Sequence, residues 1–358
     1  MRKIQFYKIV FLICFWVFCA IFIMCYEASV VGFKSEIGGE HYSFLRNLII
    51  GILVCIVGAT LLASLEVLYL GKLLRKKPFG VTLLTKTIIY LMFMVFFISM
   101  VILYVYSAEI NKPLLSTDVL KLYLDFIFSG RVVMTFTYWG IACISALFML
   151  QVNDKFGQGV LISFFLGKYH RPQEDERIFL FMDLKSSTTY AEKLGHIKYS
   201  QFIQDCFFDI TDVIAKYDAK IYQYVGDEVV LSWNIKEGIK NGQCIKIYFA
   251  YDSLIQSKKM YYKDKYGIIP EFKAGMHLGK VTVAEVGEIK KELAYHGDVL
   301  NTAARIQGKC NEFKKRLLIS EPIKALLKKQ HLFKFSDIGE VSLRGKARQV
   351  YLYGVEPA

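Results

Sequence analysis

The chain has 358 residues, of which 54% are hydrophobic, and it carries a formal net charge of +13. So much apolar side chain, with a mean hydropathy of +0.35, excludes a single water-soluble globule and indicates membrane spans. The positive charge forms no basic stripe with interleaved aromatic residues. We therefore expect no nucleic-acid partner and assign the charge to an anionic membrane surface and solvated helix faces, although an acidic, phosphate-bearing substrate would also suit it.

The hydrophobic residues are concentrated in residues 1–152, which we interpret as a membrane domain. Glu66 lies near the end of one apolar run and is expected at the membrane interface. No run carries a charge at its centre, so an ion path or proton relay is not expected. Anchoring, dimer formation and sensing all stay open for this domain. Four runs have the length that a transmembrane helix needs, at about 9–26, 48–70, 87–106 and 132–152.

Basic residues flank these runs unevenly. The N-terminus and the loop 71–86 are rich in lysine and arginine, whereas the loops 27–47 and 107–131 carry fewer and include acidic residues. The positive-inside rule then puts the N-terminus and everything after residue 152 in the cytoplasm. The first run resembles a signal peptide, but three similar runs follow it, so we predict an anchor and an integral inner (plasma) membrane protein.

A connector is expected at residues 153–175. Its apolar run Val160–Leu166 is too short to span a membrane. Simple spacing and coupling between the two parts of the chain are equally open. None of the eight cysteines forms a CxxC pair, so neither a zinc site nor a disulfide framework is indicated.

Residues 176–358 have the pattern of a soluble domain in which strands and helices alternate. Gly226-Asp227 between two apolar runs is a hairpin signal, which forces antiparallel pairing. We therefore predict an α+β domain of ferredoxin-like type, with helices on a mainly antiparallel sheet. The expected strands are 178–183, 220–225, 228–233, one or more within 271–287, 317–320, 332–341 and 349–355, and the expected helices are 188–217, 239–264, 298–312 and 321–329.

Two aspartates end strand-like apolar runs in this domain. Asp183 follows Ile178–Met182, and Asp227 follows Ile221–Gly226. A strand, a helix and a second strand can bring two such carboxylates side by side. Neighbouring carboxylates repel unless a cation lies between them, so the arrangement predicts a divalent-metal site.

Hydroxyl residues open the helix that follows Asp183. The sequence there is Ser186-Ser187-Thr188-Thr189. Free N–H groups and the helix dipole at such an N-terminus suit a triphosphate, but the same residues can simply cap the helix. Taken alone, this motif favours the plain cap.

A carboxamide and a guanidinium share one face of a later helix. Asn301 and Arg305 are four residues apart, and Asp298 is expected to cap the helix. Such a pair can hold a sugar and a phosphoryl group, although an isolated pair is more often a solvated helix face. Near the end of the chain, Arg344-Gly345-Lys346 forms a basic turn that is either ordinary surface or a phosphate contact.

Together these motifs resemble those of the class III nucleotide cyclases, the adenylyl and guanylyl cyclases. The resemblance covers about residues 176–356 and keeps five motifs in order and spacing, which makes chance similarity remote. It implies a ferredoxin-like class III cyclase catalytic domain after the helical transmembrane region. The motifs are Phe181–Thr188, Tyr224–Asp227, Ala274–Gly279, Gly297–Arg305 and the turn Arg344–Lys346.

The resemblance implies a role for each candidate residue. Asp183 and Asp227, with the Leu184 carbonyl, would bind two divalent cations, Mg²⁺ or Mn²⁺. Asn301 would orient the ribose, and Arg305 would stabilise the phosphoryl group in transfer. The reaction implied is conversion of ATP to 3′,5′-cyclic AMP and pyrophosphate. Six further positions are implied to contact the substrate: Ser187, Thr188, Gln223, Ala294, Arg344 and Lys346.

The positions that select the base depart from the family pattern. Adenylyl cyclases commonly have lysine where this chain has Gln223, and aspartate or threonine where it has Ala294; guanylyl cyclases commonly use glutamate and a small residue. A glutamine amide can donate or accept, so GTP stays open as a substrate. Ala294 has no polar side chain, which would leave the contact to Tyr295, His296 or a backbone group. Ser187 replaces the family's usual phenylalanine.

In this family each site lies between two catalytic domains, one giving the aspartates and the other the asparagine and arginine. This chain carries both sets, which implies a homodimer with two equivalent sites. Two other classes remain as alternatives. One is a non-catalytic nucleotide-binding sensor with a cyclase-like fold, and the other is a channel or transporter with a regulatory domain.

Overall fold

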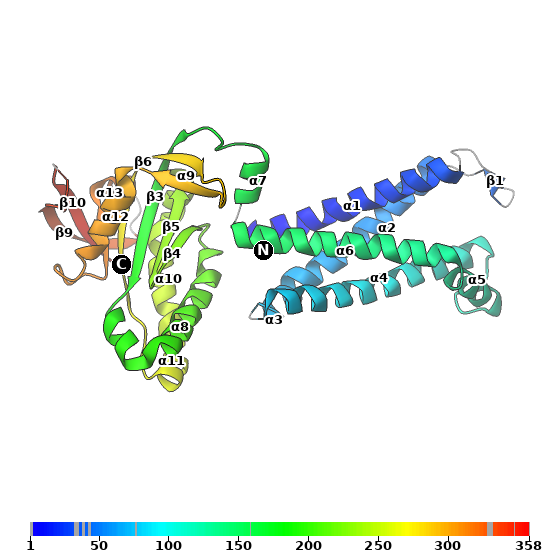
Figure 1. Cartoon of the computed structure of the whole chain (residues 1–358), viewed down its shortest axis with the longest axis horizontal. Coiled ribbons are helices and arrows are strands. Elements are labelled where there is room, and N and C mark those ends of the chain that lie inside the picture. The colour runs from blue at the N-terminus through cyan, green and yellow to red at the C-terminus, as the bar shows by residue number, and fades with distance from the viewer. Residues whose placement is uncertain are drawn as a thin grey trace. The chain divides into compact units, whose positions relative to one another are not determined.

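The computed structural model describes residues 3–31, 36–37, 40–41, 44–75, 77–157, 159–327, 332–346 and 348–357. They form two compact units, Met1–Lys155 and Phe156–Ala358, each of which is described by itself (Figure 1).

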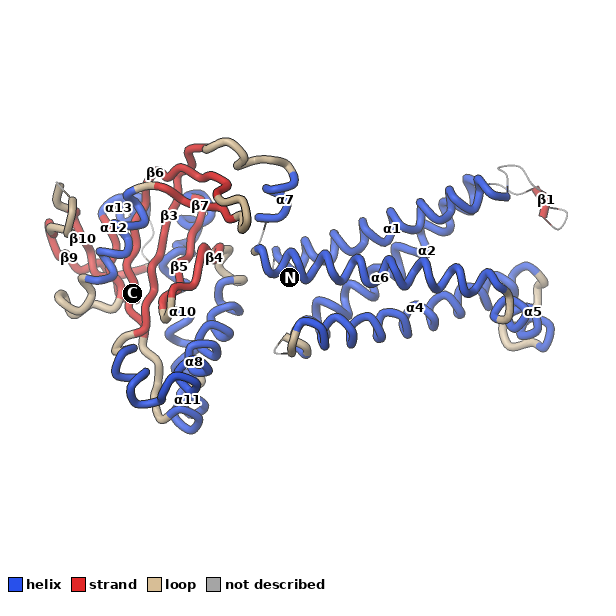
Figure 2. The backbone as a smooth tube through the Cα atoms, viewed as in Figure 1, coloured by secondary structure: helices blue, strands red, loops and turns tan. Residues whose placement is uncertain are grey.

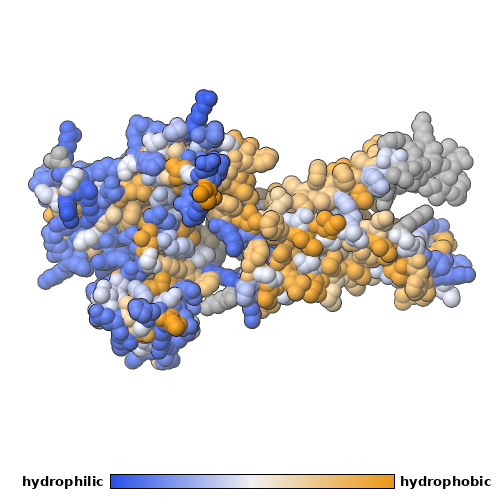
Figure 3. Space-filling model, in the orientation of Figure 1, coloured by the Kyte–Doolittle hydropathy of each residue, from blue (hydrophilic) through white to orange (hydrophobic). Residues whose placement is uncertain are grey.

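The first unit is built from four long apolar helices. They are α1 (Lys3–Val31), α2 (Phe44–Leu65), α4 (Phe79–Glu109) and α6 (Gly130–Phe156). Each coincides with a predicted run and is long and apolar enough to cross a membrane. Apolar residues dominate the visible face of this unit (Figure 3), as expected for a surface that meets lipid. The unit also contains the short helix α3 (Gly71–Leu73), the helix α5 (Thr117–Ile127) and the two-residue strands β1 (Glu36–Ile37) and β2 (Glu40–His41).

Helix α5 (Thr117–Ile127) was not expected from the sequence. It lies in the 107–131 loop, and Ser116 caps its first turn by accepting a hydrogen bond from the Val119 N–H at 3.5 Å. Its apolar and polar residues fall on opposite faces, the pattern of a helix that lies along a surface.

Glu66, expected at the membrane interface, is a buried charge within the first unit. Glu66 begins a π-helical turn, η1 (Glu66–Leu70), that continues α2, and its side chain is buried. Its carboxylate forms an ion pair with Lys86 of α4 and accepts a hydrogen bond from the Tyr90 hydroxyl at 3.2 Å. The predicted third run began at residue 87, one residue too late to include this buried lysine. A charged side chain becomes tolerable in an apolar interior only when it is paired in this way.

The second unit is organised around an eight-stranded, mostly antiparallel sheet. The strand order is β4-β5-β3-β6-β8-β10-β9, and β7 pairs with β6. Among the described strand pairs, β6 and β8 form the only parallel pair, and the others are antiparallel. Figure 2 shows β3 and β6 side by side at the centre of the sheet. The strands are β3 (Gln173–Leu184), β4 (Lys220–Val225), β5 (Glu228–Asn234), β6 (Phe272–Val286), β7 (Glu292–His296), β8 (Leu317–Ser320), β9 (Phe333–Val341) and β10 (Val350–Pro357).

Strand β3 is buried on both faces, which explains its unbroken apolar run. Ile178, Leu180 and Met182 point to one face and join the core that carries helices α8 (Ser187–Ile214), α10 (Gln243–Ser257) and α13 (Glu321–Leu327). Phe179 and Phe181 point to the opposite face, where α12 (Asp298–Gly308) packs. Period-2 alternation then places Asp183 on the α12 face. Three short helices complete the unit: α7 (Val160–Phe165), α9 (Ile235–Ile239), whose Ile239 packs against the same core as Ile178, and η2 (Lys240–Gly242).

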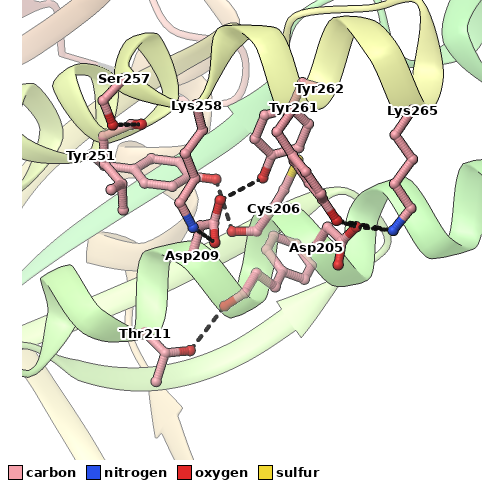
Figure 4. A network of polar contacts seen from close by, with 12 residues as sticks. Asp205, Cys206, Asp209, Thr211, Tyr251, Ser257, Lys258, Tyr261, Tyr262 and Lys265 are labelled. Atoms are coloured by element: carbon pink, nitrogen blue, oxygen red, sulfur yellow. Dashed lines mark hydrogen bonds and ion pairs between the residues drawn. The ribbon is translucent and has the colours of Figure 1, made fainter. Parts of the chain in front are cut away.

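The predicted helix 239–264 is wrong as a single element. The structure has α10 and then α11 (Lys259–Tyr266), separated at Lys258. The break lets α11 turn its side chains towards α8: Tyr261, Lys265 and Tyr266 all donate to Asp205 at 2.6–2.7 Å. Lys258 itself bonds Asp209 at 2.6 Å (Figure 4). The hydrophobic periodicity of the sequence carries no information about these polar contacts between helices. The prediction therefore missed the break at the end of α10.

Helix α12 lies almost directly on the backbone of β6. A Cβ atom at Gly275 would come 2.1 Å from the Gln307 backbone nitrogen and 2.7 Å from the Ala303 carbonyl oxygen. A Cβ at Gly279 would come 2.7 Å from a Val299 methyl group. The Gly275-to-Gly279 stretch therefore sets how closely α12 approaches the sheet.

We expect Gly275→Ala to destabilise the second unit by about 1–3 kcal/mol, because its methyl group must displace a helix backbone rather than a flexible side chain. Gly308→Ala is the matched control. Gly308 is at the end of the same helix with nothing within 4 Å of its added Cβ, so that variant should be neutral or slightly stabilised. Thermal unfolding of the two variants compares them, and equal melting temperatures would contradict this description of the helix–sheet contact.

Candidate functional site

Asp183 and Asp227 meet at one end of the sheet. Asp183 is the penultimate residue of β3, and its cross-strand partners are Glu228 on β5 and Lys273 on β6. Asp227 occupies the β4–β5 turn, where Gly226 adopts a φ of +61° that favours glycine. The predicted hairpin therefore places Asp227 directly before Glu228, the residue that lies opposite Asp183.

The carboxylates are close enough to influence each other's ionisation. Burial raises the pKa of Asp183, and the charge of Asp227 raises it further, whereas Lys273 acts in the opposite direction. Burial, followed by the charges of Asp183 and Asp227, raises the pKa of Glu228 to about 7. Such a cluster favours a bound cation.

Two further observations fit a cation at this place. Oδ2 of Asp227 is buried and has no hydrogen-bond partner. Lys273 Nζ lies 3.5 Å from Oδ2 of Asp183, so the protein already puts one positive charge there. Leu184, whose carbonyl was expected to be a ligand, follows Asp183 as the last residue of β3. The described residues contain no group of three or more histidine, cysteine or acidic side chains arranged as a metal cage.

The start of α8 is not an ordinary capped helix. Ser186 stands at the N-cap position with a φ of +59° and makes no side-chain capping bond, so the plain-cap interpretation is wrong for the described geometry. Ser187 and Thr188 are the first two helical residues. Tyr199 lies near Ser187 and near both aspartates. Burial, then the charge of Asp227, raises the pKa of Tyr199 to about 12. The backbone N–H groups of this turn are left for another acceptor.

Helix α12 presents Asn301 and Arg305 on the side away from the sheet. Asn301 is exposed, and Nη1 of Arg305 is buried without a hydrogen-bond partner. The turn before β10 covers this side: a Cβ at Gly345 would lie 3.3 Å from the Arg305 guanidinium. Lys346 Nζ contacts Asp298 Oδ2 at 2.9 Å, whereas Arg344 is exposed.

The expected capping role of Asp298 is wrong. Gly297 occupies the N-cap position, and Asp298 is the first helical residue. Although burial alone would raise it, the hydrogen bond and charge of Lys346 lower the pKa of the Asp298 carboxyl. Asp298 therefore tethers the basic turn to the helix instead of capping it.

The two candidate base-contacting residues lie on opposite faces of the sheet. A β-bulge between Ile221 and Gln223 puts Tyr222 and Gln223 on the α12 face together. Tyr295 pairs with Val283 on this face, and its ring is 4.9 Å from that of Tyr222. Ala294, one residue earlier, alternates to the other face. The geometry thus brings Tyr295, and not Ala294, to the side that carries Gln223.

Residues 170–356 match the model of the family described as adenylate and guanylate cyclase catalytic domain. This match covers more than half of the chain. The chain belongs to this family.

Two curated relatives and several solved structures resemble the cyclase chain. It is 30% identical over 204 residues to Adenylate cyclase 2 of Rhizobium meliloti (strain 1021), covering 57% of this chain and 56% of that protein. It is 25% identical over 182 residues to Adenylate cyclase 1 of the same organism, covering 49% and 27%. The chain thus spans about half the length of the first and about a quarter of the second.

A solved structure described as the adenylyl cyclase CyaB from P. aeruginosa aligns with a TM-score of 0.45 and 20% identity, covering 52% of this chain and 97% of that one. Another, the guanylate cyclase domain of RhGC from Catenaria anguillulae in complex with GTP, aligns with a TM-score of 0.44 and 15% identity, covering 52% and 98%.

Four residues near the cyclase aspartates were missed by sequence reasoning. Pairing the predicted strands in antiparallel register would have found Glu228 and Lys273, because both lie opposite Asp183. Tyr199 and Gln307 had no such signal. They reach the site from helices whose rotation about their axes is fixed only by packing.

His277 provides a pH-dependent contribution to the stability of the cyclase domain. Burial, then the nearby charge of Lys346, lowers the pKa of the imidazole to about 4, while Asp298 acts in the opposite direction. Nδ1 is 2.7 Å from the Ser320 hydroxyl. Because the folded pKa is below the unfolded value of about 6.5, the contribution is complete above pH 6.5 and is lost as the pH falls towards 4.

We therefore expect His277→Gln to flatten the acid side of the stability curve between pH 6.5 and 4, removing a loss of at most roughly 3 kcal/mol. Urea unfolding of both proteins at a series of pH values measures this difference. Parallel curves over that window would show that His277 ionises equally in the folded and unfolded chains.

Proposed function

We propose that the chain is a membrane-bound nucleotide cyclase that converts ATP to 3′,5′-cyclic AMP and pyrophosphate in a homodimer with shared sites. The observation that carries the proposal is the meeting of Asp183 and Asp227, with Asp227 Oδ2 buried and unpartnered. A buried carboxylate oxygen without a donor is costly unless a cation or another ligand completes it.

In the proposed mechanism Asp183, Asp227 and the Leu184 carbonyl would hold two divalent cations, Mg²⁺ or Mn²⁺. When bound, these cations lower the pKa of the ribose 3′-hydroxyl and neutralise charge on the triphosphate. The 3′-oxygen forms a bond with the α-phosphorus, the bond from that phosphorus to the pyrophosphate oxygen breaks, and the hydroxyl proton leaves to solvent.

The remaining candidate residues orient the nucleotide. Asn301 would orient the ribose, and Arg305 would donate to the α-phosphoryl oxygens as negative charge develops on them. Nη1 of Arg305 has no partner in the single chain, which supports this role. Arg344 is exposed, whereas Lys346 is already engaged with Asp298, so Arg344 is the turn residue proposed to meet the triphosphate. Ser187 and Thr188 would offer backbone N–H groups.

The proposal includes a second copy of the chain, and it is supported by Asn301 and Arg305 facing away from their own sheet. Each site would take its aspartates from one chain and these two residues from the other. The four long apolar helices support a membrane location, with the N-terminus and the cyclase domain proposed to be cytoplasmic.

ATP is proposed as the substrate because the two curated relatives are named adenylate cyclases. Gln223 is exposed on the edge strand β4, where its amide can meet the edge of a purine. Tyr295 takes the place proposed earlier for Ala294, since it lies on the same face. GTP is the second candidate, because a glutamine amide fits either purine.

The test is an assay of the purified full chain in detergent or lipid nanodiscs with Mg²⁺ or Mn²⁺. ATP and GTP are supplied separately, and cyclic nucleotide and pyrophosphate are measured together. Equal amounts of the two products from ATP would support the proposal, and product from GTP alone would change the substrate. A dimeric protein that binds nucleotide but forms neither product would be a non-catalytic sensor.

A further inference from the structure

Gln307 connects helix α12 to the metal half of the site. Its Nε2 donates to Oδ2 of Asp183 at 3.0 Å, and only 7% of its surface is exposed. Lys273 approaches the same oxygen at 3.5 Å. Both contacts fall on Oδ2, so Oδ1 is the carboxylate oxygen available to a cation. Gln307 therefore fixes the orientation in which Asp183 offers that oxygen.

The backbone at Gln307 cannot shift easily. It lies against Gly275 so closely that an added Cβ would overlap the Gln307 nitrogen and Cα. Three residues later, the Cys310 thiol donates to the Ala274 carbonyl oxygen at 3.3 Å. The C-terminal end of α12 is thus held against β6 at Gln307 and at Cys310. Any movement of Asp183 that keeps its hydrogen bond to Gln307 would have to move this end of the helix.

The same helix carries Asn301 and Arg305 on another side. Arg305 is two residues before Gln307, which is roughly 200° around an α-helix, and Asn301 is six before it, or roughly 240°. Asn301 is exposed, and Arg305 keeps an unpartnered nitrogen. One 11-residue helix therefore touches Asp183 with its inner side and presents two polar groups with its outer side.

We propose that Gln307 is a positioning residue for Asp183, and that α12 couples the two sites of the dimer through it. The inference rests on the proposed function, in which α12 gives Asn301 and Arg305 to the site whose aspartates belong to the other chain. Cation binding at Asp183 in one site then steadies the helix that completes the second site. By the reciprocity of coupling, filling the second site strengthens cation binding in the first.

The first experiment measures Mn²⁺ binding to the full chain by electron paramagnetic resonance, without nucleotide. Gln307→Leu keeps the volume but removes the donor, and it should weaken Mn²⁺ binding about 10-fold, as loss of a hydrogen-bond partner of a metal ligand commonly does. Thr302→Val is the matched control: Thr302 is buried on α12 and bonds only within the helix, to Asp298. Unchanged Mn²⁺ affinity in Gln307→Leu would overturn the positioning role.

The second experiment uses a heterodimer with one intact site. One chain carries Arg305→Ala and gives the aspartates of the intact site, and the other has no change in either half and gives Asn301 and Arg305, so that both sites keep their carboxylates. Gln307→Leu is placed in either chain in turn. In the first chain it should raise the Mn²⁺ concentration needed for half-maximal rate. In the second chain it should lower kcat roughly 5-fold with that Mn²⁺ requirement nearly unchanged.

The two placements separate positioning from coupling. An effect only in the aspartate-giving chain would overturn the coupling, because the helix would then act on its own Asp183 alone. Thr302→Val in either chain should change kcat less than twofold. If the unmodified heterodimer forms but is inactive, the shared-site function fails, while Mn²⁺ binding to Gln307→Leu still decides whether Gln307 positions Asp183.

Discussion

Mixing an Asp227→Ala chain with an Arg305→Ala chain is expected to restore cyclase activity that neither variant has alone. Asp227→Ala removes a carboxylate from both sites of its homodimer and should lower kcat on the order of 10³-fold. Arg305→Ala removes the donor to the phosphoryl group and should cost roughly 10²–10³-fold. In the mixed dimer one site carries both defects and the other carries neither.

The restored rate should be at most about half that of the unmodified homodimer per heterodimer formed, because only one of the two sites is intact. Differently tagged chains, purified in sequence, give the heterodimer for assay. A mixture of Asp183→Ala with Asp227→Ala is the control: both changes fall on the metal half, so every site remains defective. Activity in that control, or none in the first mixture after heterodimers are confirmed, would contradict the shared site.

Removing either charge of the Glu66–Lys86 pair should destabilise the first unit by about 3–5 kcal/mol. Both side chains are buried, so Glu66→Gln leaves a buried ammonium group and Lys86→Met leaves a buried carboxylate. The double variant Glu66→Gln/Lys86→Met should recover most of the loss, because no unpaired charge remains. The melting temperature of the first unit, measured on the full chain in detergent, compares the two single variants and the double variant.

The ion pair between Lys8 and Asp154 is the matched control in the same unit. Its side chains are 30% and 54% exposed, and the atoms Nζ and Oδ1 are 2.6 Å apart. Exposed pairs contribute about 0–1 kcal/mol, so Lys8→Met should change the melting temperature little. A similar loss in Lys8→Met and Lys86→Met would show that burial does not determine the effect.

The sequence predicted the sheet well where side-chain alternation and turns were strong. β8 was placed at its observed bounds, and the Gly226-Asp227 hairpin formed as expected. β3 begins at Gln173, before the predicted start at residue 178, because its first residues are polar and continue pairing with β6 at an exposed edge. β7 was missed because it is only five residues long, follows a lysine-rich turn and shows no clear alternation of apolar and polar side chains.

Site residues were predictable where a motif carried the chemistry. Asp183 and Asp227 followed from apolar runs that end in a carboxylate. Gln307 did not, because its contact with Asp183 depends on how closely α12 packs on Gly275. The choice between Ala294 and Tyr295 was open in the sequence, because it depends on the strand register, which places Tyr295 on the α12 face.

The strand by which the chain enters the cyclase domain is also the strand that ends at Asp183. β3 is paired with β6 along all 12 residues and with β5 along seven. Sliding it by one residue would turn every buried side chain to the wrong face, so a displacement along its axis is not available. A displacement at Gln173 is therefore expected to turn β3 together with its paired neighbours rather than to slide it along its axis. The strand extends roughly 40 Å, from Gln173 at the end of the connector to the carboxylate proposed to bind the cations.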